Sequence, residues 1–248
     1  MTITQLEREI RILRLYAVVS TVVVICALMA TARAQTTRQH FTELDVERLN
    51  IVEADGRASL VLANTERLPG VLLGGKELPK EFSSGRIGSA GLLFVDAQGN
   101  EVGGLTYAAR VRADGSFTAD GSLTFDQHNQ DQVVGLQYDD DGTRRVYGLN
   151  VWDVPTKVTI AEMLQAAGDA RDRATRHRRF AELLKARGET PGARRVFLGS
   201  EDRTAALKIA DIAGRDRIRM YVDTANRARL EFLDESGKVL YAIPDQRR

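Results

Sequence analysis

The amino-acid sequence predicts a mainly β protein, α+β overall, in which an N-terminal transmembrane helix precedes a β-hairpin or meander ectodomain with a helical insert. Three observations carry this prediction. An uncharged apolar stretch lies near the amino terminus, short apolar runs alternate with Asp/Gly turns over most of the chain, and one long segment of helix-forming composition interrupts those runs. A chain of 248 residues has room for one large domain or two small ones.

The apolar stretch at residues 15–32 is just long enough to cross a bilayer as a helix, and arginines flank it on both sides. Two interpretations compete. The triplet ARA at 32–34 fits a secretory signal peptide that is cleaved after Ala34. The apolar run is longer than the usual signal core, however, and the helical spacing of apolar residues in LEREIRILR continues it towards the amino terminus. An uncleaved anchor is therefore favoured.

The orientation of this helix follows from the basic residues beside it. Arg8, Arg11 and Arg14 favour an amino terminus inside the cell, although Arg33 and Arg38 act in the opposite sense. The sequence thus predicts a single-pass protein of the cell membrane whose ectodomain is extracytoplasmic (periplasmic).

The rest of the chain divides into segments that differ in residue pattern. NIVEADGRASLVLAN at 50–64 predicts two short strands around an Asp-Gly turn, and Asp211, Asp223 and Asp234 each end an apolar strand at a regular spacing. We expect six segments: a cytoplasmic segment 1–14, a transmembrane helix 15–32, a linker 33–40, a β-rich domain 41–155, a helical insert 156–192 and a C-terminal β-repeat region 193–248.

Helical composition is concentrated in residues 159–188. Thr159 and Glu162 have the spacing of a capping box, and Gly188 followed by Pro191 is typical of a helix stop. Gly168 is a point at which this segment can divide into two helices.

The C-terminal strands have mixed faces. In RLEFLDE, alternation places Leu230 and Phe232 on one face, and Leu233 beside charged residues on the other. Neither face is purely polar, so we expect both to be covered, and self-association would cover them as well as exposed strand edges.

The octapeptide FDQHNQDQ at 125–132 is the densest group of chemically active side chains. Asp126, His128, Asn129 and Asp131 are its candidate ligand-binding residues, and a polar hairpin turn is the favoured interpretation. No third ligand supports a metal site at Asp126 and His128. A hydrolase or carbohydrate-binding enzyme of the cell envelope that uses Asp126 and Asp131 is the alternative, and it depends on the separation of these carboxylates.

A basic stretch lies inside the helical segment. Its arginines could bind an anionic surface such as anionic lipid, or could form the solvated face of a helix, which is favoured because aspartates stand four residues before two of them. The candidate residues are Arg171, Arg173, Arg176, Arg178 and Arg179.

Composition excludes several classes of function. The formal charge of +1, from 35 basic and 34 acidic residues, gives no field that attracts nucleic acid, and 6% aromatic residues are too few for base stacking. Cys26 is the one cysteine, which excludes an intramolecular disulfide and a thiolate metal cluster. We expect no cofactor, no metal and no catalytic residue.

The chain resembles one family over nearly its whole length. The runs VERLNIVEADGRASLVLANTERLPG, AGLLFVDAQGNEVGGL, SLTFDQHNQDQ, RVFLGS and RIRMYVDTANRARLEFLDESGKV are similar to a family of uncharacterised bacterial proteins with one N-terminal membrane helix and a β-rich ectodomain of Asp/Gly-turn repeats. The resemblance implies a membrane-anchored architecture and an uncleaved anchor, and it implies no activity.

Together these patterns favour a non-enzymatic protein, a membrane-anchored extracytoplasmic scaffold or binding module of the bacterial envelope. Its expected partners are the lipid bilayer, further copies of the same chain, and other envelope proteins, with no nucleic acid.

Overall fold

The structure is a computed structural model that describes residues 3–33, 39–79, 82–168, 170 and 172–244. The chain forms two compact units, residues 1–45 and residues 46–248. Strands account for 42% of the chain and helices for 21%, which confirms the mainly β class with one N-terminal apolar helix and a small helical part.

The first unit contains the helix α1 (Ile3–Arg33). Its segment Glu7–Ala27 has a mean hydropathy of 2.0, and none of that segment is buried. The helix is thus long and apolar enough to cross a membrane, although a signal sequence has the same properties. It begins well before residue 15, as the apolar spacing in LEREIRILR predicts. Most of the expected linker, residues 34–38, lies outside the described residues.

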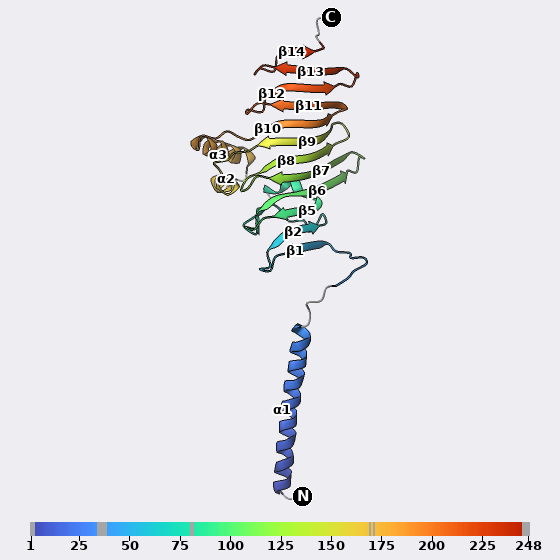
Figure 1. Cartoon of the computed structure of the whole chain (residues 1–248), viewed down its shortest axis with the longest axis vertical. Coiled ribbons are helices and arrows are strands. Elements are labelled where there is room, and N and C mark those ends of the chain that lie inside the picture. Colours follow the sequence, from blue (N-terminus) through green and yellow to red (C-terminus); the bar gives the residue numbers. More distant parts are fainter. Residues whose placement is uncertain (1–2, 34–38, 80–81, 169, 171, 245–248) are drawn as a thin grey trace. The chain divides into compact units, whose positions relative to one another are not determined.

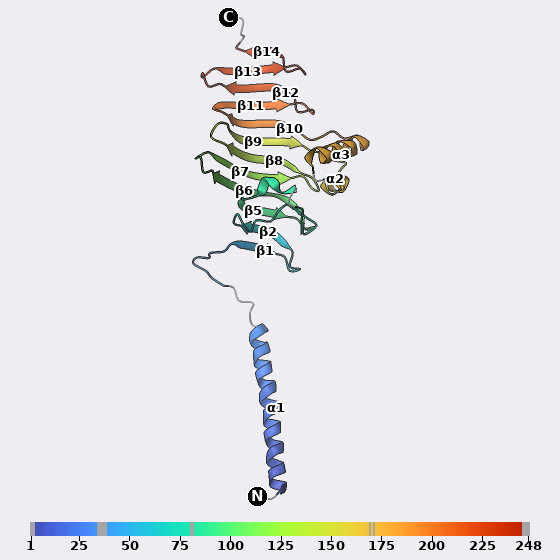
Figure 2. The same cartoon turned by 180° about the vertical axis from the view of Figure 1, so that it is seen from behind.

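The second unit is one antiparallel sheet of twelve strands (Figures 1 and 2). In sheet order the strands are β1 (Arg48–Val52), β2 (Ala58–Ala63), β5 (Ala90–Val95), β6 (Glu101–Val111), β7 (Phe117–Asp126), β8 (Gln132–Asp140), β9 (Arg145–Asp153), β10 (Ala193–Glu201), β11 (Thr204–Ala210), β12 (Asp216–Val222), β13 (Ala228–Leu233) and β14 (Val239–Ile243). The short strands β3 (Leu72–Leu73) and β4 (Lys76–Glu77) form a separate hairpin.

Asp/Gly turns explain why the strands follow one another as a meander. Asp211 is representative: its carboxylate accepts the backbone N–H groups of Ala213 and Arg215 at 3.0 and 3.1 Å, and Gly214 takes the left-handed conformation that such a turn requires. Asp223 and Asp234 make the same two bonds at the next turns. The regular spacing of these aspartates is therefore the spacing of successive hairpins.

The helical insert forms between β9 and β10 without interrupting the sheet. It contains α2 (Ile160–Ala167) and α3 (Arg173–Ala186). Both halves of the predicted capping box at Thr159 and Glu162 are present, and Gly168 ends α2, so these two predictions are confirmed. Strands β9 and β10 pair along eight positions, so the β regions on either side of the insert form one continuous sheet.

The two faces of this sheet differ. The loop that joins β2 to β5, with its short 3-10 turn η2 (Ser84–Arg86), lies over one face, as Figure 2 shows from that side. The other face, turned towards the viewer in Figure 1, carries an apolar ladder described below and has no described element over it. We call these the covered face and the leucine face.

Candidate functional site

A cavity of about 380 Å³ lies on the covered face, beneath the loop that joins β2 to β5. The sheet contributes Thr106 from β6 together with Ser122, Thr124 and Asp126 from β7. The loop adds apolar and basic groups, and the start of α2 closes one end through Ile160. The lining is therefore mixed, with hydroxyl, carboxyl and apolar groups converging on one space.

An ion pair forms one wall of the cavity. The guanidinium of Arg86 donates two parallel hydrogen bonds to the carboxylate of Glu101, one of them at 2.7 Å, and a third of 3.4 Å to the carbonyl of Pro69. The two side chains are only 18% and 10% exposed. This bidentate pair ties the loop to the first residue of β6 and so sets the width of the cavity.

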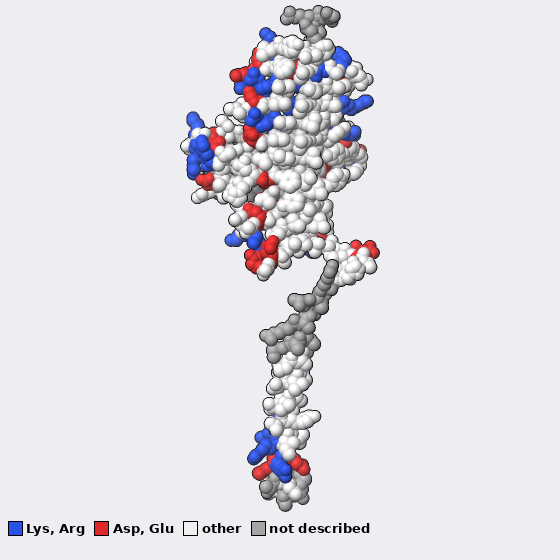
Figure 3. Space-filling view, in the orientation of Figure 1, with Lys and Arg blue, Asp and Glu red and all other residues white. Residues whose placement is uncertain are grey.

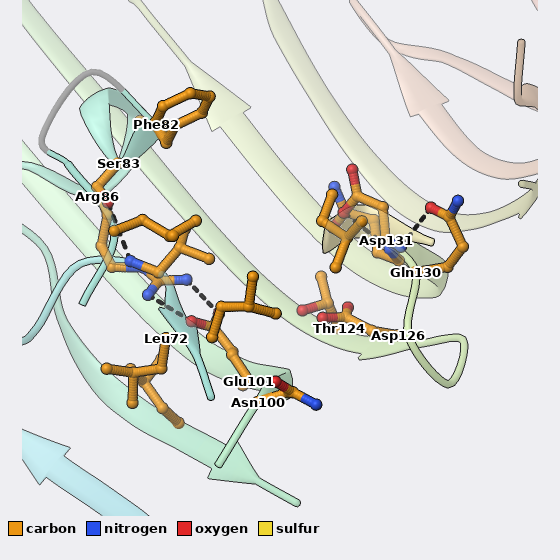
Figure 4. Close-up of a pocket in the computed structure, with 18 of the residues that line it drawn as sticks. Leu72, Phe82, Ser83, Arg86, Asn100, Glu101, Thr124, Asp126, Gln130 and Asp131 are labelled. Carbon is orange, nitrogen blue, oxygen red and sulfur yellow. Dashed lines mark hydrogen bonds and ion pairs between the residues drawn. The ribbon is translucent and has the colours of Figure 1, made fainter. Parts of the chain in front are cut away.

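Two aspartates stand across the cavity from that pair. Asp126 ends β7 and Asp131 lies in the turn that follows, and Figure 4 shows both on the side opposite Arg86 and Glu101. Burial raises the pKa of Asp126 to about 7, the negative charges of Asp131 and Glu101 add to the rise, and Arg86 opposes it. A carboxyl with this pKa exchanges its proton near neutral pH.

The octapeptide forms a hairpin turn, which bears out its favoured interpretation. Gln127 N–H donates to the carbonyl of Asp131 at 3.0 Å, and Asn129 adopts a left-handed backbone with φ of 57°. The turn also holds the insert, because the carbonyl of Asn129 accepts the N–H of Ile160 at 2.9 Å.

The four candidate residues of the octapeptide do not all reach the cavity. Asp126, Asn129 and Asp131 line it, whereas His128 is exposed, is not among the lining residues described, and has its Nε2 2.9 Å from the Asn129 side-chain nitrogen. Among the described residues, no three His, Cys, Asp or Glu side chains converge as a metal site. Arg86 and Glu101 could not be recognised as site residues from the sequence, because only the fold brings these two side chains together.

Replacing Asp126 with Asn is expected to raise stability at pH 8 and leave it nearly unchanged at pH 4. Because the pKa of Asp126 is about 7 when folded and 3.8 as a free side chain, the wild-type protein loses stability as pH rises between these values. The gain is roughly 2 kcal/mol above pH 7, about half of what the full shift implies, because the carboxyl keeps some contact with water. Thermal melts of the full-length protein in mild detergent at the two pH values measure it.

Asp45→Asn is the matched control for this comparison. Asp45 is exposed and is not among the residues that line the cavity, so its substitution should change the melting temperature by a similar small amount at both pH values. Equal melting temperatures of Asp126→Asn and wild type at pH 8 would contradict the assignment of a raised pKa.

The arginines of the helical insert fall into different roles. Arg176 lies over the ring of Phe82, 5.3 Å from its centroid, and Arg179 donates to the carbonyl of Ala167 at the end of α2. Arg176 thus joins the insert to the loop between β2 and β5, and Arg179 joins α3 to α2. Arg173 and Arg178 are exposed and stay candidates for binding an anionic surface, while Arg171 lies outside the described residues.

The leucine face carries an unbroken apolar column across all twelve strands. Residues that pair directly point to the same face of an antiparallel sheet, so the register defines the column. In sheet order it consists of Leu49, Leu62, Leu92, Leu105, Leu123, Leu136, Leu149, Leu198, Leu207, Met220, Leu230 and Ile243.

Two further columns flank this central one on the same face. On one side the members are mostly β-branched or aromatic: Phe125, Val134, Val151, Val196, Ile209, Ile218, Phe232 and Tyr241. On the other side they are Tyr107, Gly121, Tyr138, Tyr147, Ser200, Ala205, Val222 and Ala228. Figure 3 shows this face as a broad uncharged surface over the sheet, with charged side chains mainly towards its sides.

The leucine face is exposed in the described structure. Leu105, Leu136 and Leu198, all in the central column, are 51%, 53% and 53% exposed. Soluble monomers rarely expose contiguous apolar patches of more than a few hundred Å², and larger ones usually mark an interaction site. This surface is the second candidate site of the molecule.

Comparison of the chain with protein-family models, with curated proteins and with solved structures found no match.

Proposed function

We propose that the protein is a membrane-anchored, extracytoplasmic scaffold or binding module of the bacterial envelope, without a catalytic role. The observation that carries this proposal is the leucine face, a continuous apolar surface that the described parts of the chain leave uncovered. Burial of apolar area is the dominant favourable contribution to most protein association. A surface of this extent is costly to leave in water, and a binding partner removes that cost.

The first unit supports the membrane part of the proposal. Glu7–Ala27 has the length and hydropathy of a span, and its side chains are exposed along the helix as they would be in lipid. Arg8, Arg11 and Arg14 favour an amino terminus on the cytoplasmic side. The sheet unit would then lie in the periplasm, where other envelope proteins and further copies of the chain are available as partners.

Cell fractionation and site-specific photo-crosslinking test this function together. The full-length protein should stay in the membrane fraction after alkaline extraction, and external protease should digest the sheet unit in spheroplasts. A photo-crosslinking amino acid at Leu136 should yield a reproducible adduct in cells. The same amino acid at Ile87, an exposed apolar residue off the leucine face, should yield none. Release by alkali, or absence of an adduct at Leu136, would contradict the proposal.

A second candidate function is hydrolysis in the cell envelope, favoured by one observation. Asp126 and Asp131 line the same cavity, and burial raises the pKa of Asp126 to about 7 while Asp131 is exposed. Two carboxyl groups in different environments can divide the roles of general acid and general base. In this alternative, protonated Asp126 would be the acid and Asp131 the base.

Assays with envelope polysaccharides and matched variants test the alternative. Asp126→Asn and Asp131→Asn should each reduce hydrolysis by about 100-fold or more, whereas His128→Ala should have little effect because His128 is exposed and outside the described lining. Equal rates of hydrolysis for wild type and both aspartate variants would exclude hydrolysis by Asp126 and Asp131.

A further inference from the structure

We propose that the leucine face binds the same face of a second copy of this chain, and that the two sheets form a face-to-face β-sandwich. The inference rests on the proposed function, since it names the partner for the proposed docking surface. In this arrangement a two-fold axis runs between the sheets, along the direction in which the strands are stacked, so that each strand faces its own counterpart.

The size of the leucine face matches what a stable dimer buries. Twelve strands at about 4.8 Å extend for roughly 58 Å, and three columns at about 7 Å span roughly 20 Å. Because the central column covers twelve strands and each flanking column covers eight, each copy offers about 940 Å², and the pair would bury about 1,900 Å² in total, which lies in the range of specific, stable interfaces. A smaller partner, such as a single peptide strand, would leave most of the three columns in water.

The relief of the central column suits packing against a copy of itself. From β5 to β14 the column alternates between half-buried and exposed side chains. Leu92, Leu123 and Leu149 are half-buried, whereas Leu105 and Leu136 on the strands between them are exposed. Because each strand faces its own counterpart, the exposed side chains of the two copies meet across the interface and are buried there, between sheets about 10 Å apart.

The margins of the face resemble the polar rim of an interface. Beyond Tyr138 and Tyr147, the next pair in the register is Asp140 and Arg145, whose Oδ2 and Nε atoms are 2.6 Å apart. On the other margin Asp153 is paired with Arg195. Because these four charges are neutralised in pairs within each copy, they do not oppose the approach of two such faces.

The covered face cannot form the same contact. The loop between β2 and β5 lies over part of it, and further along the sheet it carries Lys208, Arg219 and Glu231. The carboxylate of Glu231 accepts hydrogen bonds of 2.9 Å from both Arg219 and the Tyr221 hydroxyl. Two such faces would bury charged groups against each other, so association is directed to the leucine face.

The proposed symmetry is compatible with a shared membrane. A two-fold axis along the stacking direction places both β1 strands at the same end of the dimer, and the chain enters the sheet unit at β1. Both anchoring helices can then reach one bilayer. An axis along the strands would send the two chains to opposite ends.

Lipid acyl chains are the competing occupant, and the exposure pattern disfavours them. A groove that encloses an acyl chain has a central line less exposed than its edges. Here the central residues Leu136 and Leu198 are as exposed as Tyr147 and Phe125 in the flanking columns, with values between 46% and 53%. Around β8 and β10 the face is thus open, and there it suits another broad surface better than a narrow chain.

Cysteine crosslinking of the full-length protein in cell membranes tests the inference. With Cys26→Ser as background, Met220→Cys is placed in the central column on the tenth strand in sheet order. A short bismaleimide, which can join thiols that are too far apart for a disulfide, should link it to its counterpart across sheets about 10 Å apart and give a band of twice the chain mass. If the axis ran along the strands instead, this cysteine would face the third strand of the partner and form no such bond. Ile87→Cys, at a position that is also apolar and exposed but lies off the face, should give no dimer band.

A second substitution links that band to the leucine face. Leu136→Glu in the Met220→Cys chain should reduce crosslinking by about tenfold or more, because a carboxylate would be buried between the sheets without a partner. Ile87→Glu in the same chain should leave the band unchanged. If the Leu136→Glu variant fails to accumulate in cells, the inference is tested by comparing the dimer bands of Met220→Cys and Ile87→Cys alone.

Three results would overturn the inference: no dimer band from Met220→Cys, an equal band from Ile87→Cys, or photo-adducts at Leu136 that contain only lipid or another protein. An adduct with another protein would leave the scaffold function standing. Loss of membrane attachment with the dimer band retained would contradict the proposed function and leave the dimer intact.

Discussion

Replacing Arg86 with Met is expected to lower the free energy of unfolding by about 3–5 kcal/mol. The substitution leaves the Glu101 carboxylate with 10% exposure and without the guanidinium that donates hydrogen bonds to it and balances its charge. It also removes the positive charge that opposes the rise in the pKa of Asp126, so that ionised Asp126 becomes less stable in the folded protein. The loss of free energy of unfolding relative to wild type should therefore grow as pH rises above 7. For a chain of this size the melting temperature should fall by roughly 10 °C, which thermal melts in mild detergent can measure.

Arg67→Met is the matched control, because Arg67 forms its ion pair with Glu47 at the surface, where the two side chains are 62% and 66% exposed. That variant should lose less than about 1 kcal/mol. The double variant Arg86→Met/Glu101→Met should recover most of the stability lost in Arg86→Met, since no charge is then left buried. Equal losses in Arg86→Met and Arg67→Met would mean that the loop is not held by this ion pair.

The local features of this fold were predictable from the sequence, and their physics explains why. A capping box is decided by two residues three positions apart, so Thr159 and Glu162 could be recognised without knowing the neighbours of α2. A hairpin turn is likewise decided within five residues, as the hydrogen bonds around Asp211 show. Helix-forming composition and the apolar run in α1 belong to the same class of local information.

The candidate sites depend on register and on long-range contacts, and these were not predictable. Arg86 and Glu101 are 15 positions apart with β5 between them, and nothing in either local sequence specifies the pairing. Asp126 and Asp131 line the same cavity because the chain turns between them, at Asn129.

The leucine face had a signal in the sequence that went unused. Many strands carry a leucine, isoleucine or methionine two positions from a β-branched or aromatic residue, as in Val134 with Leu136 and Leu230 with Phe232. The alternation predicted in RLEFLDE is one example of this pattern. Its continuity across the sheet requires the pairing of β9 with β10 over the helical insert, and no short stretch of sequence contains that information.

Replacing Phe197 with Ala is expected to cost about 3–5 kcal/mol, and it tests whether the β regions on either side of the insert unfold together. Phe197 is 1% exposed, and two cations lie near its ring, with Arg194 at 5.0 Å and Lys208 at 5.6 Å from the centroid. It is on β10, which pairs with both β9 and β11. A cavity here should therefore weaken the sheet on both sides of the insert.

Two probes separate the possible outcomes of that substitution. Fluorescence of Trp152 reports on β9, and far-ultraviolet circular dichroism reports on the whole sheet. Both transitions should shift together by roughly 10 °C, because the sheet is continuous through β10. Ile212→Ala, at an exposed turn position, should shift neither. If the dichroism signal fell in two steps while the Trp152 transition stayed at its wild-type temperature, strands β10–β14 would form a separate folding unit, as the predicted boundary between 155 and 193 allows.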